Sequence, residues 1–158
     1  MQIQGSTDAA GLRIAIVVSR FNDFVTDRLL AGAKDALVAA GAAADAIDTI
    51  GVPGAYEVPQ AARMAAALGS YDAVICLGCL IRGETPHFEY ISEAVAHGIM
   101  SASAATGVPM SFGVLTTNSA EQALERAVPG RANKGWEAAM AAVEMATLRR
   151  GLRAGSVA

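Results

Sequence analysis

LRIAIVV, at residues 12–18, is a nearly continuous apolar run rich in β-branched side chains. Such a run is typical of a β-strand that is buried on both faces, as in a parallel sheet covered by helices. Apolar residues then recur at helical spacing, and Gly41 is a natural point for that helix to stop. The helical positions are Val25, Leu29, Ala33, Leu37 and Ala40. The chain therefore opens with a strand followed by a helix.

The same alternation continues along the chain and predicts one α/β domain. Further strands are expected at residues 47–52, 71–81 and 108–115, and further helices at 58–68, after residue 86, at 119–126 and from Asn133 to about Arg150. Alternating strands and helices fold as a three-layer αβα sandwich around a parallel sheet, here of four strands. The short helix has two overlapping capping boxes, Asn118 with Glu121 and Ser119 with Gln122.

Length and composition narrow the class of protein further. The chain has 158 residues, a net charge of −3 and 53% hydrophobic residues. The apolar excess predicts contacts between subunits, and the lack of a strongly basic run argues against nucleic-acid binding. Residues 1–11 are polar and do not resemble a signal peptide, and no apolar stretch is long enough to span a bilayer. We therefore expect a cytoplasmic homo-oligomer that binds neither nucleic acid nor a membrane.

Cys76 and Cys79 have the spacing of a redox pair or of half a zinc site. They fall inside a predicted strand, however, where residues three apart point to opposite faces. A thioredoxin-like pair opens a helix instead, and the chain has no further cysteines to complete a zinc site. We interpret both as small core residues and expect no metal.

Ligands of such sheets bind beyond the carboxyl ends of the strands. The strongest local signal there is GETPHF, at residues 83–88. Thr85 is a good N-cap and Pro86 a good first helical residue, so a helix is expected to open here. Its free N–H groups would suit a phosphate, and His87 beside them could move protons. The alternative is a well-capped helix whose histidine only faces solvent.

Other side chains after the strands have two interpretations each. Phe21 is either a platform for a flat ring or a loop aromatic folded onto the core. Glu57 either accepts hydrogen bonds from a polyol or favours the start of the next helix. Arg126 either pairs with a phosphate or is an ordinary cation at a helix end. His97 lies about 280° around the helix from His87, so the two cannot share a metal, and we expect a packing or surface role.

Several common motifs are absent from the sequence. There is no P-loop, no G-x-G-x-x-G after the first strand, no nucleophile elbow and no H-E-x-x-H. These absences weaken nucleotide-binding, flavin-phosphate, hydrolase and metalloprotease interpretations.

Taken together, the segments after the strands resemble the lumazine synthase family. The matching segments are SRFN at 19–22, GAYEVP at 54–59, LGCLIRGETPHFEYI at 77–91, FGVLTTN at 112–118, EQALER at 121–126 and NKGWEA at 133–138. The resemblance implies a flavodoxin-like sandwich over residues 12–150. It also implies the condensation of 5-amino-6-(D-ribitylamino)uracil with 3,4-dihydroxy-2-butanone 4-phosphate to 6,7-dimethyl-8-ribityllumazine, phosphate and water, without a cofactor.

The resemblance also implies a role for each matching residue. Phe21 matches the platform for the pyrimidine, and His87 matches the residue that transfers protons. The pyrimidine and the ribityl chain would be held by Ala55, Tyr56, Glu57 and the strand end Cys79, Leu80 and Ile81. The phosphate would bind at Glu84, Thr85 and Arg126. Phe112 and Arg126 match groups supplied by a neighbouring subunit, and Lys134 falls near the site without a defined role.

The family assembles as homopentamers, and some members close twelve pentamers into an icosahedral capsid. By resemblance, residues 2–4 of an N-terminal arm (1–11) would add a strand to a neighbour's sheet. Residues 151–158 are expected to form a flexible tail. The stretch 127–132, AVPGRA, is glycine-rich in many capsid-forming members, whereas Pro129 restricts the backbone here. The alternatives are a non-catalytic ligand-binding or shell-forming protein and a flavodoxin-like electron carrier.

Overall fold

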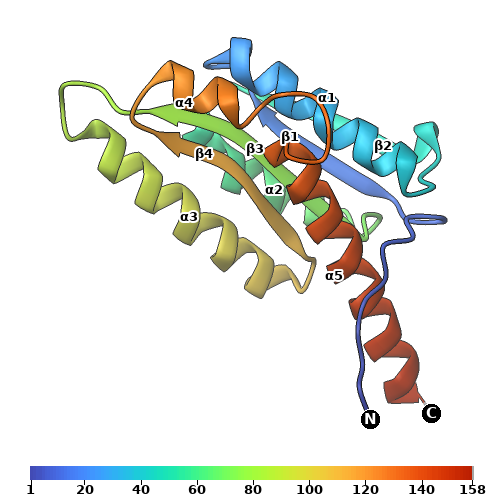
Figure 1. Ribbon diagram of the computed structural model, residues 1–158. Helices are drawn as coiled ribbons and strands as arrows, with labels where there is room; N and C mark the ends of the chain where they lie inside the picture. Colours follow the sequence, from blue (N-terminus) through green and yellow to red (C-terminus); the bar gives the residue numbers. More distant parts are fainter. Residues whose placement is uncertain (158) are drawn as a thin grey trace.

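The computed structural model describes residues 1–157, and it is built on a four-stranded parallel sheet (Figure 1). The strand order is β2-β1-β3-β4, and every neighbouring pair is parallel. The strands are β1 (Ile14–Ser19), β2 (Ile47–Val52), β3 (Ala73–Ile81) and β4 (Met110–Thr117). β4 lies at one edge of this sheet, and all four carboxyl ends point the same way.

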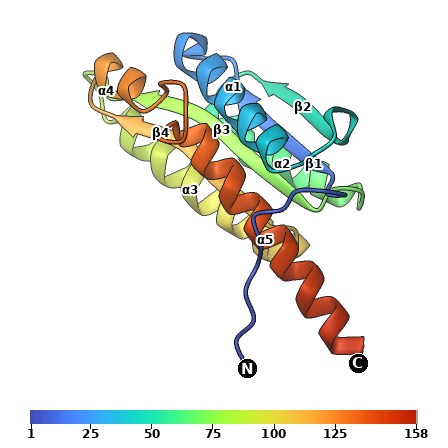
Figure 2. The same cartoon turned by 45° about the vertical axis from the view of Figure 1, so that its right-hand side comes forward.

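Helices cover both faces of the sheet, which makes the predicted three-layer αβα sandwich (Figures 1 and 2). One face carries α1 (Asp23–Ala39) and α5 (Lys134–Val157), and the other carries α2 (Val58–Ala67) and α3 (His87–Thr106). The short helix α4 (Ala120–Glu125) follows β4, and single 3₁₀ turns lie at Ala44–Ala46 and Ala55–Glu57. No helix of residues 1–157 is long and apolar enough to cross a membrane.

Successive side chains of the central strands point to opposite faces of the sheet and so divide the core into two halves. Ile14 and Ile16 of β1 pack toward α1 and α5, whereas Ala15 and Val17 pack toward α2 and α3. All four side chains are fully buried, as expected for a strand covered on both sides. The two cysteines follow the same rule, since Cys76 lies in the α2–α3 half and Cys79 in the α1–α5 half. Their interpretation as core residues on opposite faces is confirmed.

A close seam between α1 and α5 fixes the start of the last helix. The buried Asn133 caps α5, because its Oδ1 accepts hydrogen bonds from the N–H groups of Gly135 at 2.7 Å and Trp136 at 3.2 Å. Its Nδ2 donates to the carbonyl of Arg28 on α1 at 3.2 Å. A Cβ on Gly135 would lie only 2.0 Å from the carbonyl oxygen of Leu29. The two helices therefore touch through backbone at this point.

The ends of three elements differ from the prediction. The long helix begins at His87 with Pro86 at its N-cap, and the Thr85 hydroxyl makes no capping bond, so the predicted cap was one residue early. At α4 the Ser119 hydroxyl accepts from the Gln122 N–H at 3.2 Å, but the Gln122 side chain accepts from the N–H of Asn118. α5 continues through Val157, so residues 151–157 are helical where a flexible tail was expected. Ala158 lies outside the described residues.

The N-terminal arm lies along α5 in both views (Figures 1 and 2). The Ser6 N–H donates to the Thr147 hydroxyl at 2.8 Å, and that hydroxyl donates back to the Ser6 carbonyl at 3.2 Å. Residues 1–4 are exposed and form no strand within this chain. Addition of residues 2–4 to a neighbour's sheet stays a prediction.

Candidate functional site

An open cleft of about 750 Å³ lies beyond the carboxyl ends of β1, β2 and β3, where the first turns of α3 close one side. Eight of the predicted site residues line it: Phe21, Ala55, Tyr56, Glu57, Leu80, Ile81, Thr85 and His87. They come from four separate segments of the chain, which the parallel sheet brings to a common edge. The cleft is therefore in the position that the order of strands and helices predicts.

Phe21 projects from the turn between β1 and α1. Its side chain is 69% exposed and is not folded onto the core. The turn is attached to the end of β2, because the N–H of Arg20 donates to the Val52 carbonyl at 2.8 Å and the N–H of Phe21 to the Pro53 carbonyl at 3.0 Å. An accessible ring on an anchored backbone is suited to stacking against a flat ligand.

The second wall is the short 3₁₀ turn Ala55–Glu57 that follows β2. Ala55 is buried and anchors the turn to the core, whereas Tyr56 is exposed and Glu57 is half-buried. The turn closes through a hydrogen bond from the Glu57 N–H to the Gly54 carbonyl at 3.2 Å. Although α2 follows at once, the Glu57 side chain makes no capping bond to it, so its carboxylate is available to a ligand.

The floor is the end of β3, and its neighbour is the loop that leads to α3. Cys79 is buried, Leu80 and Ile81 are half-buried, and residues 82–86 are exposed. His87, the first residue of α3, faces solvent at the rim of the cleft, as does Thr85. Glu84 lies in the same exposed loop but does not line the cleft.

Arg82 holds this loop against two neighbouring elements, the end of β4 and the first turn of α3. Its Nε donates to Asn118 Oδ1 beyond β4 at 2.9 Å, and its backbone N–H donates to the Thr117 carbonyl at 2.8 Å. Its guanidinium also pairs with Glu89 and lies 4.6 Å from the centre of the Phe88 ring, both on α3. The position of the first turn of α3, and so of His87, therefore depends on Arg82.

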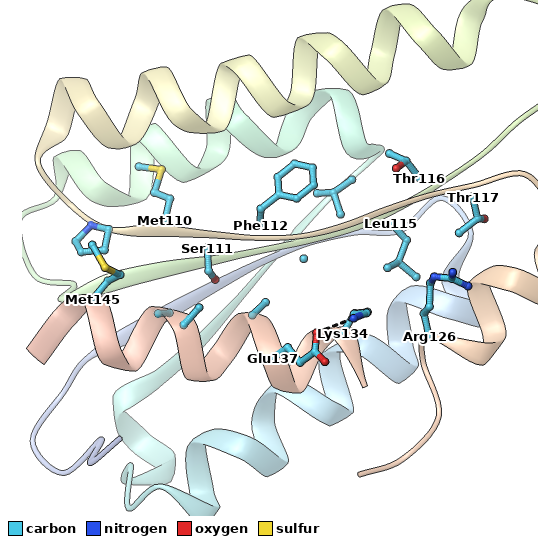
Figure 3. Close-up of a pocket in the computed structure, with 16 residues that line it drawn as sticks. Met110, Ser111, Phe112, Leu115, Thr116, Thr117, Arg126, Lys134, Glu137 and Met145 are labelled. Carbon is cyan, nitrogen blue, oxygen red and sulfur yellow. Dashed lines mark hydrogen bonds and ion pairs between the residues drawn. The ribbon is translucent and has the colours of Figure 1, made fainter. Parts of the chain in front are cut away.

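Phe112 and Arg126 lie elsewhere, along a second hollow of about 460 Å³ between β4 and α5 (Figure 3). Phe112 is half-exposed on β4 and points toward the α3 side, while Arg126 projects from the end of α4. Arg126 makes a hydrogen bond to the Gln122 carbonyl at 2.9 Å, and Lys134 pairs with Glu137 at 2.8 Å. No residue lines both hollows. One chain therefore does not bring Phe112, Arg126 or Lys134 to the His87 cleft.

Asn22, Tyr90 and Phe88 also line the cleft. None of them was assigned a functional role from the sequence, although Asn22 lies in the segment 19–22 that follows the first strand. Tyr90 is three residues after His87, and residues three apart share a face of a helix, so its place could have been derived once His87 was chosen. Phe88 is half-buried and takes part in the Arg82 contact. For Asn22 the sequence indicates a place after the first strand but no contact and no role.

Burial governs the ionisation of the two cysteines, because a charged thiolate is poorly solvated inside the core. It raises the pKa of Cys76 to about 12 and that of Cys79 to about 11. Neither thiol is therefore suited to act as a nucleophile. Among the described residues, no group of three His, Cys, Asp or Glu side chains could hold a metal ion.

The fold is that of an α/β protein with a cleft at the carboxyl edge of its parallel sheet. Exposed rings, a carboxylate and a helix start make this cleft suited to a small ligand with flat and polar parts. The chain matches the family model for 6,7-dimethyl-8-ribityllumazine synthase over residues 11–150. It is also 51% identical over 146 residues to the 6,7-dimethyl-8-ribityllumazine synthase of Desulfatibacillum aliphaticivorans, with 92% of this chain and 94% of that protein covered. The chain belongs to the 6,7-dimethyl-8-ribityllumazine synthase family, which confirms the resemblance found in the sequence.

Proposed function

We propose that this chain condenses 5-amino-6-(D-ribitylamino)uracil with 3,4-dihydroxy-2-butanone 4-phosphate to 6,7-dimethyl-8-ribityllumazine, phosphate and water. This is the penultimate step of riboflavin biosynthesis, and it makes the protein a transferase. Family membership supports the reaction, and the observation that carries it is the single cleft that collects Phe21, Glu57 and His87.

The pyrimidine substrate is assigned to the part of the cleft between Phe21 and the end of β3. The exposed Phe21 ring stacks on the heterocycle, and the backbone at the end of β3, from Cys79 to Ile81, reads its polar edge. Leu80 and Ile81 line the cleft, whereas Cys79 is buried. The turn Ala55–Glu57 holds the ribityl chain, because the Glu57 carboxylate can accept hydrogen bonds from several hydroxyls.

The phosphorylated substrate is assigned to the start of α3. Free N–H groups at a helix start attract anions, and the backbone of Glu84 and Thr85 extends this site into the loop. Arg126 supplies the opposite charge, as a bidentate partner of the phosphate. Because Arg126 and Phe112 do not line the cleft of their own chain, we assign them to the cleft of a neighbouring subunit.

His87 is the group that moves protons in this scheme. The amine of the pyrimidine attacks the ketone to form an imine with loss of water. Elimination of phosphate then gives an enol that becomes a second carbonyl. The ribitylamino nitrogen attacks this carbonyl and closes the ring with loss of a second water. Each step transfers a proton, and a histidine at the cleft rim can accept and return it. Most of the acceleration comes from holding the two substrates together, so neither a metal nor a redox cofactor takes part.

The site requires an assembly, for which we propose a cytoplasmic homopentamer as the basic unit. Exposed apolar side chains on β4 and α5, such as Phe112, Met145 and Leu152, support contacts between copies. A 60-subunit icosahedral capsid is the larger form open to the family. The stretch 127–132 bears on that choice, since Pro129 limits the backbone while Gly130 adopts a positive φ of 106°.

The test is a one-pot assay that follows the fluorescence of the lumazine product. The two substrates are mixed with the purified oligomer beside an enzyme-free control, since they react slowly unaided. We expect product well above the control, and a raised KM for the butanone phosphate in Arg126→Ala. The exposed Arg131→Ala removes the same charge nearby and should behave like the parent protein. A folded oligomer with the rate of the control would refute the proposed reaction.

A further inference from the structure

Asn22 has an unusual backbone conformation for its residue type. It lies at the N-cap of α1 with φ 63° and ψ 44°, in the left-handed region, and among the described residues it is the one non-glycine residue with a positive φ. Asparagine and aspartate tolerate this conformation better than other side chains, and such residues concentrate at functional sites. The conformation turns the chain from β1 into α1 and leaves Phe21 at the outside of the turn.

The side chain of Asn22 connects this turn to a second strand. Its Nδ2 donates a hydrogen bond of 2.9 Å to the carbonyl of Cys79, near the end of β3. The bond is partly buried, and Cys79 itself is fixed in the core. Only the NH₂ group of the amide can face a carbonyl oxygen, so this bond also sets the orientation of the Asn22 amide.

Further hydrogen bonds hold the backbone around Asn22 to α1, to the end of β1 and to the segment after β2. Its carbonyl accepts from the N–H groups of Val25 at 2.9 Å and Thr26 at 3.1 Å, and the Thr26 hydroxyl donates to the Ser19 carbonyl at 2.8 Å. The N–H of Phe21 is held by the Pro53 carbonyl after β2. The bond to Cys79 joins this turn to β3, the strand whose end forms the cleft floor.

From this geometry we propose that Asn22 is a positioning residue, which fixes Phe21 over the cleft and holds the Cys79 carbonyl in place. The assignment rests on the proposed function for the identity of the ligand. It predicts an effect confined to the pyrimidine substrate, because Phe21 and the end of β3 bind that molecule and the phosphate site lies at α3.

Three variants separate the hydrogen bond from the backbone conformation. Asn22→Gly adopts the left-handed conformation freely but has no side chain to reach Cys79. Asn22→Asp also tolerates that conformation, yet it places a carboxylate oxygen against the Cys79 carbonyl. Asp27→Asn, one turn along α1, is an exposed control that makes no contact with the cleft.

The first readout is the KM for each substrate. A lost hydrogen bond of ordinary strength predicts a pyrimidine KM raised about 3- to 10-fold in Asn22→Gly, and raised further in Asn22→Asp. The KM for the butanone phosphate should stay within about 2-fold of the parent value in all three variants. Parent-like pyrimidine KM values in both Asn22 variants would overturn the proposal, as would equal rises for both substrates.

The second readout is amide hydrogen exchange of the intact oligomer, which does not depend on the proposed reaction. In Asn22→Gly and Asn22→Asp, the segment 19–26 should exchange faster by a similar factor, about 3- to 10-fold, and Asp27→Asn should not change it. Unchanged exchange in both Asn22 variants would show that the Asn22–Cys79 hydrogen bond does not hold the turn in place. If the parent protein is inactive but the variants exchange faster, the proposed function is refuted, while the role of the Asn22–Cys79 hydrogen bond in holding the turn is supported.

Discussion

His87 illustrates how one residue can be placed by the sequence while its chemistry depends on the fold. The preceding strand could be predicted, and the helix start to within one residue, and the structure puts the imidazole at the rim of a cleft next to Thr85. The second histidine, His97, is exposed on the same helix but does not line the cleft. The two side chains therefore form a matched pair for mutagenesis.

His87→Ala should slow the reaction without abolishing it. A general acid–base group contributes at least about 10²-fold to the rate, and the remaining acceleration comes from holding two substrates that already react slowly unaided. We expect kcat to fall by about that factor while both KM values change little. Stopped-flow or steady-state product fluorescence measures the loss.

His97→Ala is the control for this variant, because it removes an imidazole from α3 outside the cleft. Its kcat should equal that of the parent protein. A loss of the same size in both variants would mean that the defect comes from α3 as a helix, and His87 would then have no special role.

The cysteines are predicted to be inert in the folded protein. Burial raises their pKa values to about 12 and about 11, so the thiolate that reacts with disulfide reagents is scarce at neutral pH. A water-soluble aromatic disulfide at about pH 8 should label neither residue in the native oligomer and both in denaturant. Rapid labelling of native protein, read by absorbance and mass, would contradict the buried positions of Cys76 and Cys79.

Positions after the strands, together with the family resemblance, predicted most of the residues that line the cleft. Phe21, Glu57 and His87 stand out because an aromatic ring, a carboxylate and an imidazole directly follow strands, where the core does not require them. Asn22 could not be foreseen in the same way. Its role depends on a left-handed backbone and on a bond to Cys79, which lies 57 residues away in the chain.

At the scale of elements, the strands and helices follow from hydrophobic periodicity, whereas their ends follow from local bonding. Continuous apolar runs identified β1 and β3, because both faces of these strands are buried. The start of α3 was misplaced by one residue, since Pro86 adopts ψ 5° and stays outside the helix. Sequence preferences name good caps, but the contacts of the folded chain decide which residue is used.

The seam between α1 and α5 gives a prediction for stability. Asn133→Ala should lower the free energy of unfolding by about 2 kcal/mol, because it removes the cap of α5 together with the buried bond to Arg28. Denaturant unfolding at one fixed protein concentration measures the change.

Ser119→Ala provides the comparison, because the Ser119 side chain caps a helix but makes no bond to a second helix. It also removes a side-chain cap, but α4 has only six residues and its capping bond is longer, at 3.2 Å. The expected loss is about 0.5 kcal/mol, at the lower end for such caps. Equal losses in the two variants would show that the α1–α5 seam adds nothing to the cap.

For the whole molecule, the arrangement of the two hollows is the informative feature. The cleft lies at the carboxyl ends of β1, β2 and β3, while the hollow with Phe112 and Arg126 runs along β4 and α5. Composition could predict an oligomer from the apolar excess. Composition could not predict which side chains one subunit contributes to its neighbour's cleft. That depends on where the fold places Phe112 on β4 and Arg126 at the end of α4.

This division of the site predicts complementation between two defective chains. In an oligomer co-assembled from His87→Ala and Arg126→Ala subunits, some clefts have His87 from one chain and Arg126 from its neighbour. With random mixing of equal amounts, about a quarter of the sites regain both groups. At low butanone phosphate, the mixed oligomer should therefore be clearly more active than the mean of the two parent variants.

The double variant His87→Ala/Arg126→Ala, co-assembled with the unmodified chain, is the matched control with the same number of defects. If Arg126 served the cleft of its own chain, every subunit of the first mixture would have one defect, and no mixture could restore a complete site. Activity would then equal the mean of the separate variants, while the control mixture would keep intact subunits. If Arg126 serves a neighbour, both mixtures contain complete sites in the same proportion. The comparison therefore tests directly whether the site is shared between subunits.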